Sequence, residues 1–160
     1  MALVIRRARP ADAKEIIDFN LHLAEESEGK KLDRDLLAAG VAAGLADPHK
    51  ARYFVAEDHG SIVGQMMITY EWSDWRNGWF WWIQSVYVRG DRRRQGDFRT
   101  LFEHVADLAR QDPEVIGLRL YVEQENHVAQ QTYTSLGLEP TGYLVLERYP
   151  LTEKTPGSPA

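Results

Sequence analysis

Residues 83–99 read Ile83-Gln84-Ser85-Val86-Tyr87-Val88-Arg89-Gly90-Asp91-Arg92-Arg93-Arg94-Gln95-Gly96-Asp97-Phe98-Arg99. The stretch begins with strand-forming residues, passes through a basic turn, and enters a helix with an apolar face. A helix start offers unpaired backbone N–H groups and the positive end of the helix dipole, so an anion placed there needs few side chains to hold it. This order of elements predicts a pyrophosphate site. On charge alone, a solvated basic loop explains the same residues.

Two nucleotide-binding motifs are excluded in this stretch. Five residues separate Gly90 from Gly96 and no Lys-Ser or Lys-Thr pair follows, so the turn is not a nucleotide P-loop. The GxGxxG spacing of a Rossmann fingerprint is missing as well.

The sequence before this stretch predicts one strand, two helices and an antiparallel meander. The strand covers Leu3 to Ala8, and Pro10 suits the first turn of the helix that follows. Asp33 is expected to cap the second helix, whose apolar side carries Leu36, Leu37, Val41 and Leu45 and which stops at Asp47-Pro48. The meander has strands at residues 53–55, 62–70 and 79–88, with hairpin turns at His59-Gly60 and Asn77-Gly78.

The sequence after the stretch predicts a helix, a strand, a short helix and a last strand. The first helix ends near Asp112-Pro113, and a buried strand follows at residues 118–122. The short helix runs from Asn126 to Leu136 and is closed by Gly137, and residues 143–149 form the final strand. The order β-α-α-β-β-β-α-β-α-β predicts an α/β (α+β) fold with a mixed sheet. We expect one domain over residues 1–150 and a flexible tail over residues 151–160.

Composition narrows the possible function classes. The chain has 160 residues, a formal net charge of −5, 44% hydrophobic residues and no cysteine. The absence of cysteine excludes disulfides, cysteine-ligated zinc and a cysteine acyl-enzyme, and the five histidines lack metal-ligand spacing, so we expect no metal. The acidic charge weighs against nucleic acid as a partner. No apolar run is long enough to span a membrane, and no secretory signal is visible, so we expect a cytoplasmic protein.

Asn126 and Tyr133 form a second candidate site. They lie seven residues apart on the short helix and therefore nearly on one face, where they could flank a ligand. The alternative is that Asn126 only caps the helix and that Tyr133 is a half-buried core residue.

These pieces together resemble the GNAT superfamily of acyl-CoA N-acetyltransferases over roughly residues 3–149. The residues that carry the resemblance are Val86-Tyr87-Val88, Arg93-Arg94-Gln95-Gly96-Asp97-Phe98, and the pattern Glu125-Asn126-x-x-Ala129-x-x-x-Tyr133-x-x-x-Gly137-Leu138. They are similar to that family's central strand, its pyrophosphate loop and its last helix. The run Glu71-Trp72-Ser73-Asp74-Trp75 is loosely similar to the diamine and spermidine acetyltransferase branch.

The resemblance implies a mostly antiparallel sheet that is splayed where acetyl-CoA binds. It implies that the edge of Val86, Tyr87 and Val88 pairs with the pantetheine arm like an added strand. It also implies that the backbone amides of Arg94, Gln95, Gly96, Asp97, Phe98 and Arg99 hold the pyrophosphate. Asn126 would hydrogen-bond the arm of acetyl-CoA, and Tyr133 would both contact it and act as the general acid.

Two residues depart from the family pattern. Phe98 stands where glycine or alanine is usual, and we expect its ring to turn into the core beside Leu101 and Phe102. Gln84 stands where several members carry a glutamate that is proposed to act as the base, and an amide cannot take that role. Glu71, Asp74, Glu123, Glu125 and simple desolvation of the amine all remain candidates for removing the proton.

The predicted function is direct transfer of an acetyl group from acetyl-CoA to a primary amine in a ternary complex. We expect a small cationic amine, with Glu71, Trp72, Asp74, Trp75 and Gln84 at its site, while Trp79, Trp81 or Trp82 belong to the sheet core. The identity of the amine is not readable from the residues. The alternative is a non-catalytic acyl-CoA sensor or binding module. An apolar sheet edge and the tryptophan cluster predict a homodimer.

Overall fold

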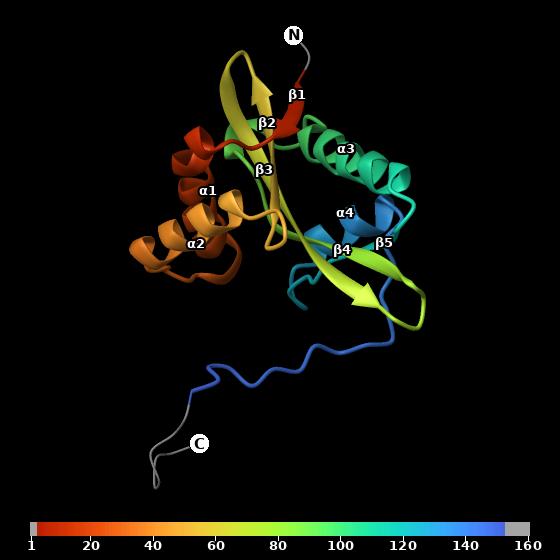
Figure 1. Ribbon diagram of the computed structural model, residues 1–160. Helices are drawn as coiled ribbons and strands as arrows, with labels where there is room; N and C mark the ends of the chain where they lie inside the picture. The colour runs from red at the N-terminus through yellow and green to blue at the C-terminus, as the bar shows by residue number, and fades with distance from the viewer. Residues whose placement is uncertain (1–2, 153–160) are drawn as a thin grey trace, which may run out of the picture.

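The computed structural model describes residues 3–152 (Figure 1). Its strands are β1 (Val4–Arg7), β2 (Arg52–Asp58), β3 (Ser61–Ser73), β4 (Gly78–Val88) and β5 (Val115–Arg119). Its helices are α1 (Ala13–Glu28), α2 (Arg34–Ala46), α3 (Asp97–Gln111) and α4 (His127–Ser135), with 3-10 turns at Pro10–Asp12 and Gly90–Arg92. Residues 153–160 of the expected tail lie outside the described part of the chain.

The five strands form one mixed sheet in the order β1-β2-β3-β4-β5. The first four pair antiparallel, and β5 pairs parallel to β4 because α3 carries the chain back across the sheet. Both expected hairpin turns are present: His59 and Gly60 have φ of 50° and 80°, and Asn77 has φ of 50°. The antiparallel meander and the parallel pair predicted from the sequence are confirmed.

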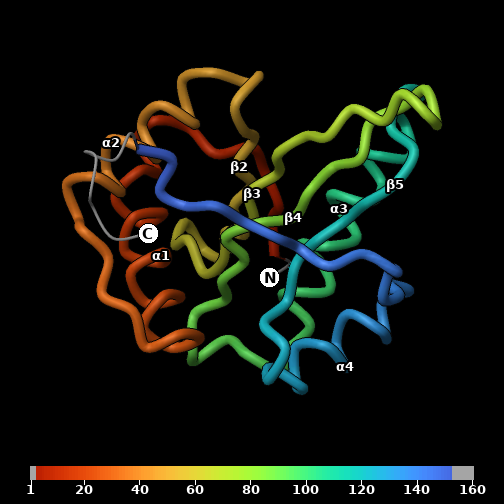
Figure 2. Tube along the Cα trace, turned by 90° about the horizontal axis from the view of Figure 1, so that it is seen from below, coloured from red at the N-terminus to blue at the C-terminus, as the bar shows by residue number. Residues whose placement is uncertain are grey.

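Helices cover both faces of the sheet (Figures 1 and 2). Successive side chains of β3 point to opposite faces of the sheet, and both faces carry apolar residues that need a cover. Met66 and Ile68 are fully buried in the core against α3, whereas Met67 packs towards the cluster under α1 and α2. The α3 cluster contains Phe54, Met66, Ile68, Trp81, Ile83, Leu101, Phe102, Val105, Ala106 and Ala109. The second cluster contains Ile16, Val41, Ala51, Tyr53 and Val55. The sheet is therefore held rigid from both sides.

Several local predictions are confirmed. The Asp33 carboxylate caps α2 by accepting hydrogen bonds from the amides of Asp35 and Leu36, and Gly137 takes the left-handed conformation after α4 with φ of 89°. The side chain of Leu36 is a correction, since it is 74% exposed and does not join the apolar side of α2.

The final strand expected at residues 143–149 does not form a ladder in the described chain. The described sheet ends at β5, and residues 139–152 are exposed throughout. The prediction was wrong because apolar strand-forming residues favour an extended backbone but do not specify the edge with which it pairs. The strand expected at residues 118–122 also lies earlier, at Val115–Arg119.

Candidate active site

A bulge interrupts β4 near its carboxyl end. Gln65 pairs with Tyr87 and Met67 pairs with Gln84, so two steps along β3 face three steps along β4. The extra residue lies at Ser85–Val86, where Ser85 has a φ of 52°. The fully buried side chain of Gln65 donates its Nε2 hydrogen to the Ser85 carbonyl oxygen at 2.9 Å. The bulge is therefore held from the neighbouring strand.

Beyond this point β4 and β5 separate. The β4–β5 register covers Trp79 to Trp82 only, and β5 ends at Arg119. From Ile83 to Val88, roughly 20 Å at ~3.3 Å per residue, the β4 edge on that side has no strand partner among residues 3–152. The expected splay of the sheet is confirmed, and Val86, Tyr87 and Val88 lie on its open edge.

The turn after β4 presents a row of backbone N–H groups. Arg94 and Gly96 have φ of 63° and 86°, which bends the chain sharply into α3. Within the described chain, no protein acceptor is recorded for the amides of residues 94–99, and the first paired amide is that of Thr100, which donates to the Gly96 carbonyl at 3.0 Å. Successive free amides at a helix start form an anion-binding concavity. The concavity and the open edge of β4 are adjacent in the chain.

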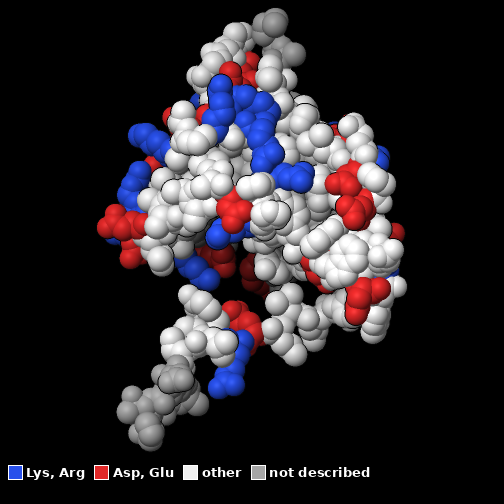
Figure 3. Space-filling view, viewed as in Figure 1, with Lys and Arg blue, Asp and Glu red and all other residues white. Residues whose placement is uncertain are grey.

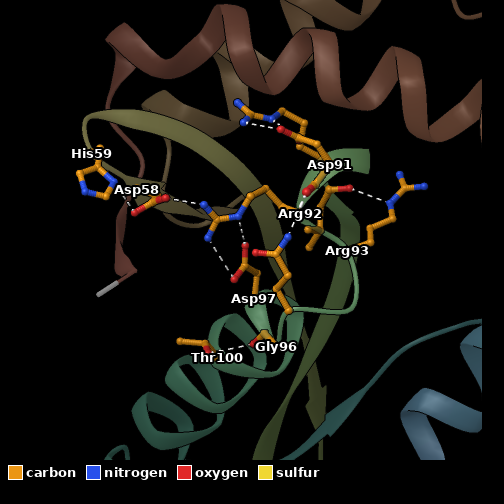
Figure 4. A network of polar contacts seen from close by, with 11 residues as sticks. Asp58, His59, Asp91, Arg92, Arg93, Gly96, Asp97 and Thr100 are labelled. Carbon is orange, nitrogen blue, oxygen red and sulfur yellow. Dashed lines mark hydrogen bonds and ion pairs between the residues drawn. The ribbon is translucent and has the colours of Figure 1, made fainter. Parts of the chain in front are cut away.

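The arginines of this turn divide into two groups, of which the first is Arg92 and Arg93 (Figure 4). Arg92 lies between two carboxylates: it pairs with Asp58 at the end of β2, and its Nε donates to Asp97 Oδ2 at 2.9 Å. Arg93 donates to the Val88 carbonyl at 3.0 Å and to Glu26 of α1 at 2.8 Å. These two side chains brace the turn, and the hydrogen bond from Arg92 lowers the pKa of Asp58.

Arg94 and Arg99 form the second group. Among the described residues, neither guanidinium has an ion-pair partner. These two arginines are therefore the ones whose charge is available to an anion at the amides. Gly96 also leaves the approach open, since an added Cβ would meet no atom within 4 Å.

α4 places Tyr133 against the start of α3. The Phe98 ring lies 5.9 Å from the Tyr133 ring and 6.2 Å from the Phe102 ring, so Phe98 packs against the core as expected. Burial raises the pKa of Tyr133, so its hydroxyl keeps its proton at neutral pH. Asn126 caps α4, with its Oδ1 accepting from the Ala129 amide at 3.2 Å, while its Nδ2 donates to no described residue.

The residues expected to bind the amine lie in two separate places. Glu71, Trp72, Asp74 and Trp75 line a pocket of about 270 Å³ at the β3–β4 turn, together with Ser73, Arg76, Arg119 and Tyr143. Gln84 is not part of this pocket; its Nε2 donates to Thr69 Oγ1 at 2.6 Å. The exposed fractions of Trp72 and Trp75 are 45% and 86%, whereas Trp81 is core at 3%. Sequence reasoning missed Arg119 and Tyr143, which come from distant parts of the chain.

Glu71 is tied into this pocket. Its Oε1 accepts from Trp82 Nε1 at 2.9 Å and from Arg119 Nη1 at 3.0 Å. The hydrogen bond from Trp82, reinforced by Arg119, lowers the pKa of Glu71. A carboxylate with a lowered pKa is a weaker base, which disfavours Glu71 as the group that deprotonates an amine. With Asp74 and Arg76 also present, the formal charges of the pocket balance.

Residues 3–152 contain neither a metal-binding cluster nor a membrane-spanning helix. No group of three or more metal-ligating side chains lies close enough together to hold a metal ion. None of the helices in this range has both the length and the apolar character needed to cross a membrane.

Comparison with known proteins agrees with this geometry. Residues 14–138 match the family model described as the acetyltransferase (GNAT) family. A possible acetyltransferase from Clostridium difficile 630 is 45% identical, with a TM-score of 0.89 over 95% of this chain and 100% of that one. A ribosomal-protein-alanine N-acetyltransferase from Brucella melitensis biovar Abortus 2308 is 18% identical, with a TM-score of 0.74 over 92% of this chain and 99% of that one.

A predicted acetyltransferase from Clostridium acetobutylicum, solved with acetyl-CoA, is 16% identical, with a TM-score of 0.75 over 91% of this chain and 96% of that one. No curated protein matches the sequence. The structures from Brucella melitensis and Clostridium acetobutylicum are both below 25% identity, and they show that this chain shares their fold.

Proposed function

The chain belongs to the GNAT acetyltransferase family, and from that premise we propose that it transfers an acetyl group from acetyl-CoA to a primary amine. The observation that carries the proposal is the continuity between the open edge of β4 and the free amides of residues 94–99. Acetyl-CoA has a diphosphate at one end of a peptide-like arm and a thioester at the other. A strand edge that leads into an anion-binding helix start suits such a molecule.

The proposed roles of the acetyl-CoA contacts follow from this placement. Val86, Tyr87 and Val88 pair with the amides of the arm, and the backbone amides from Arg94 to Arg99 hold the diphosphate. The unpaired guanidinium groups of Arg94 and Arg99 add charge there. The free Nδ2 of Asn126 is directed to the arm as a donor, a role compatible with its capping of α4 because the cap uses only Oδ1.

The acetyl transfer has two proton requirements. A primary amine with a pKa near ~10.4 is protonated at neutral pH, which is a handicap of roughly 4 to 5 kcal/mol before attack. After deprotonation, the amine nitrogen attacks the thioester carbon, a C–N bond forms, and the C–S bond breaks. A backbone N–H near Tyr87 or Val88 stabilises the oxyanion. Tyr133 gives its proton to the departing thiolate and regains one from solvent.

We propose that a group other than Glu71 removes the amine proton. The lowered pKa of Glu71 leaves Asp74, Glu123 and Glu125, acting directly or through water, together with desolvation in the tryptophan-lined pocket. The chain has no cysteine, so we propose direct attack in a ternary complex.

We propose that the amine is small and cationic and binds in the 270 Å³ pocket. The pocket residue Glu71 lies opposite Phe80, whereas the oxyanion is proposed to form near Tyr87, seven residues or ~23 Å further along β4. An amine held at Glu71 must therefore bridge about that distance to the thioester. This favours an elongated acceptor over a compact one.

The test is thiol release from acetyl-CoA with a panel of amines, on the wild type and on Tyr133→Phe. We expect turnover with at least one amine, and a kcat lower by ~10²- to 10⁴-fold in Tyr133→Phe with acetyl-CoA binding retained. Tyr53→Phe is the matched control and should turn over normally, because Tyr53 is buried in the cluster under α1 and α2 and burial raises its pKa as it does that of Tyr133.

The alternative of a non-catalytic acyl-CoA sensor has a distinct outcome. A sensor gains thermal stability with acetyl-CoA but releases no thiol with any amine. Failure of saturating acetyl-CoA to raise the Tm would count against both proposals. The cytoplasmic location and the homodimer expected from the sequence stay predictions.

A further inference from the structure

A second cavity, of about 400 Å³, lies on the α3 side of the sheet, and its volume is in the usual range for small-molecule sites. Tyr70 and Trp81, which pack in or against the α3 cluster, line it. Glu71, the residue after Tyr70 on β3, lines the 270 Å³ pocket instead, because successive side chains of a strand point to opposite faces. The two cavities have no lining residue in common.

This cavity lies beyond the carboxyl end of α3. Asp112, which directly follows α3, lines it, whereas the free amides of residues 94–99 belong to the start of the same helix. The 15 residues of α3 span about 22 Å. The cavity, which we call the α3-end cavity, is therefore separate from the site proposed for the diphosphate of acetyl-CoA and from the pocket proposed for the amine.

Arg52 gives one wall of the α3-end cavity a positive charge. Its guanidinium lies 5.1 Å from the centre of the Trp81 ring and 5.7 Å from that of Tyr70, so it extends from β2 across β3 to β4. No carboxylate of the described chain forms an ion pair with it. Lys50 also lines the cavity, but its ammonium is paired with Asp47 at 3.1 Å. The charge of Arg52 is therefore available to an anionic group.

The loop between α3 and β5 gives the wall on the β5 side a negative charge. Asp112 and Glu114 both line the cavity, and neither carboxylate has an ion-pair partner among residues 3–152. The loop is fixed beside β4, because the Trp79 amide donates to the Glu114 carbonyl oxygen at 2.8 Å. Asp112 Oδ1 accepts from the Glu114 amide at 3.0 Å, which holds the two residues together. This wall can receive a cationic group.

The two walls do not neutralise each other, although they belong to one cavity. Arg52 reaches β4, and Glu114 leads into β5, the next strand, so one to two strand spacings, or roughly 5 to 10 Å, separate them. Figure 3 shows a similar separation of charge on the outer surface, where Lys and Arg form one large group near the top and Asp and Glu form several smaller groups. A ligand with both charges satisfies both walls at once, whereas a simple ion leaves one wall unpaired.

The rest of the cavity is suited to an apolar group. The indole rings of Trp79 and Trp81 line it, and aromatic walls with a few placed polar groups are typical of small-molecule sites. The Tyr70 hydroxyl is buried and has no hydrogen-bond partner in the described chain, so an acceptor beside it is stabilising. These surfaces favour a ligand with a carboxylate and an apolar side chain.

We propose that the α3-end cavity binds a small amino acid with an apolar side chain. Its carboxylate pairs with Arg52, and its ammonium pairs with Asp112 and Glu114. Its side chain packs against Trp79 and Trp81. Binding at this site is additional to acetyl transfer and does not depend on the proposed acetyltransferase function.

The first test is the affinity of the full chain for leucine and phenylalanine, measured by calorimetry without acetyl-CoA. We expect a Kd of ~1 mM or lower for at least one of them, and a Tm raised by ~3 to 5 °C at ~10 mM. Isocaproate, which is leucine without its ammonium group, should bind at least ~10-fold more weakly than leucine. Absence of binding by both amino acids, or equal binding of isocaproate and leucine, overturns the proposal.

The second test locates the bound amino acid. Arg52→Met should lower the affinity for it at least ~10-fold, as should the isosteric double variant Asp112→Asn with Glu114→Gln, which keeps the test decisive if Arg52→Met fails to fold. Arg76→Met is the matched control, because Arg76 lines the 270 Å³ pocket and lies over the Phe80 ring at 5.5 Å. The control should keep the wild-type affinity. A loss in Arg76→Met as large as in the cavity variants, or full affinity in the double variant, contradicts the proposal.

The third test separates this site from the acetyl-CoA site. The amino acid should still bind when acetyl-CoA is saturating, because the length of α3 lies between the two sites. Loss of amino-acid binding under these conditions contradicts a site beyond the end of α3. If no amine is acetylated in the thiol-release assay, the proposed function fails, but calorimetry still decides whether the amino acid binds.

Discussion

The two halves of β4 differ in what lies on their β5 side. From Trp79 to Trp82 the strand is paired on both edges, and its neighbourhood contains a pocket closed by the Glu71 and Arg119 pair. From Ile83 to Val88 one edge is open, and the bulge at Ser85 turns the backbone. The pocket beside the paired half is lined by side chains of β3, of the β3–β4 turn and of Arg119 and Tyr143, whereas the open half presents its own backbone. The two halves of β4 therefore lie beside two chemically different surfaces.

The largest expected effect comes from the turn that ends the open half. Gly96→Val places a β-branched residue at a φ of 86°, with a strain of about 1 to 3 kcal/mol, and redirects the free amides. Losing two hydrogen bonds to a charged phosphate costs about 3 kcal/mol, so the affinity for acetyl-CoA should fall ~100-fold. Calorimetry with acetyl-CoA measures this change.

Gly29→Val is the matched control for that substitution. Gly29 has a φ of 63° at the end of α1, and an added Cβ there also meets no atom within 4 Å. The control should lose a similar amount of stability in thermal unfolding and retain its affinity for acetyl-CoA. Equal affinity losses in both variants would mean that the amides of the turn do not hold the diphosphate.

A smaller effect is expected where the two halves meet. Gln65→Leu removes the donor to the Ser85 carbonyl and, with it, a buried Oε1 that has no partner in the described chain. The free energy of unfolding should therefore change by less than about 1 kcal/mol. The bulge loses its support, so kcat should fall about 10-fold with little change in the KM for the amine.

Asn20→Leu provides the comparison for Gln65. Asn20 is also a buried amide that donates to a backbone carbonyl, that of Ile16 at 2.9 Å, but it lies in α1. Its removal should leave kcat unchanged. If Gln65→Leu behaves like Asn20→Leu in steady-state kinetics, Gln65 has only a structural role.

The smallest effect is expected at Glu71, which lies on β3 opposite the paired half of β4. The pKa of Glu71 is lowered, so its carboxylate becomes protonated only below the usual pKa of a glutamate. The stability that the ionised carboxylate contributes to the fold is therefore present at neutral pH and is lost in acid. Glu71→Gln should raise the KM for the amine a few-fold and leave the shape of the kcat profile between pH 6 and 9 as in the wild type. Loss of the acidic limb, that is, of the fall in kcat as the pH is lowered, would restore Glu71 as a candidate base.

The sequence predicted most of the fold because local signals were strong. Asn77-Gly78 identifies a hairpin turn, Asp33 a helix cap and Gly137 a helix end, each through backbone conformations that few residues favour. The bulge at Ser85 escaped prediction because serine carries no preference for positive φ. The support for that conformation comes from Gln65, twenty residues away.

The candidate site was predicted less completely than the fold. The arginines of the turn were counted together as positive charge, but Asp58, Asp97 and Glu26 neutralise two of them. The sequence presents Glu71 as a candidate base, but hydrogen bonds from Trp82 and Arg119 lower its pKa in the folded chain. Such pairings join residues far apart in the chain, and no local pattern encodes them.

Local chemistry is enough to define the strand, the basic turn and the helix start around Gly96, because each depends on neighbouring residues and on the backbone freedom of glycine. The separation of β4 from β5, the sorting of the arginines and the unpaired course of residues 139–152 arise only when distant segments meet in space. Pairing energies depend on which edges and charges come together, and that is a property of the folded chain.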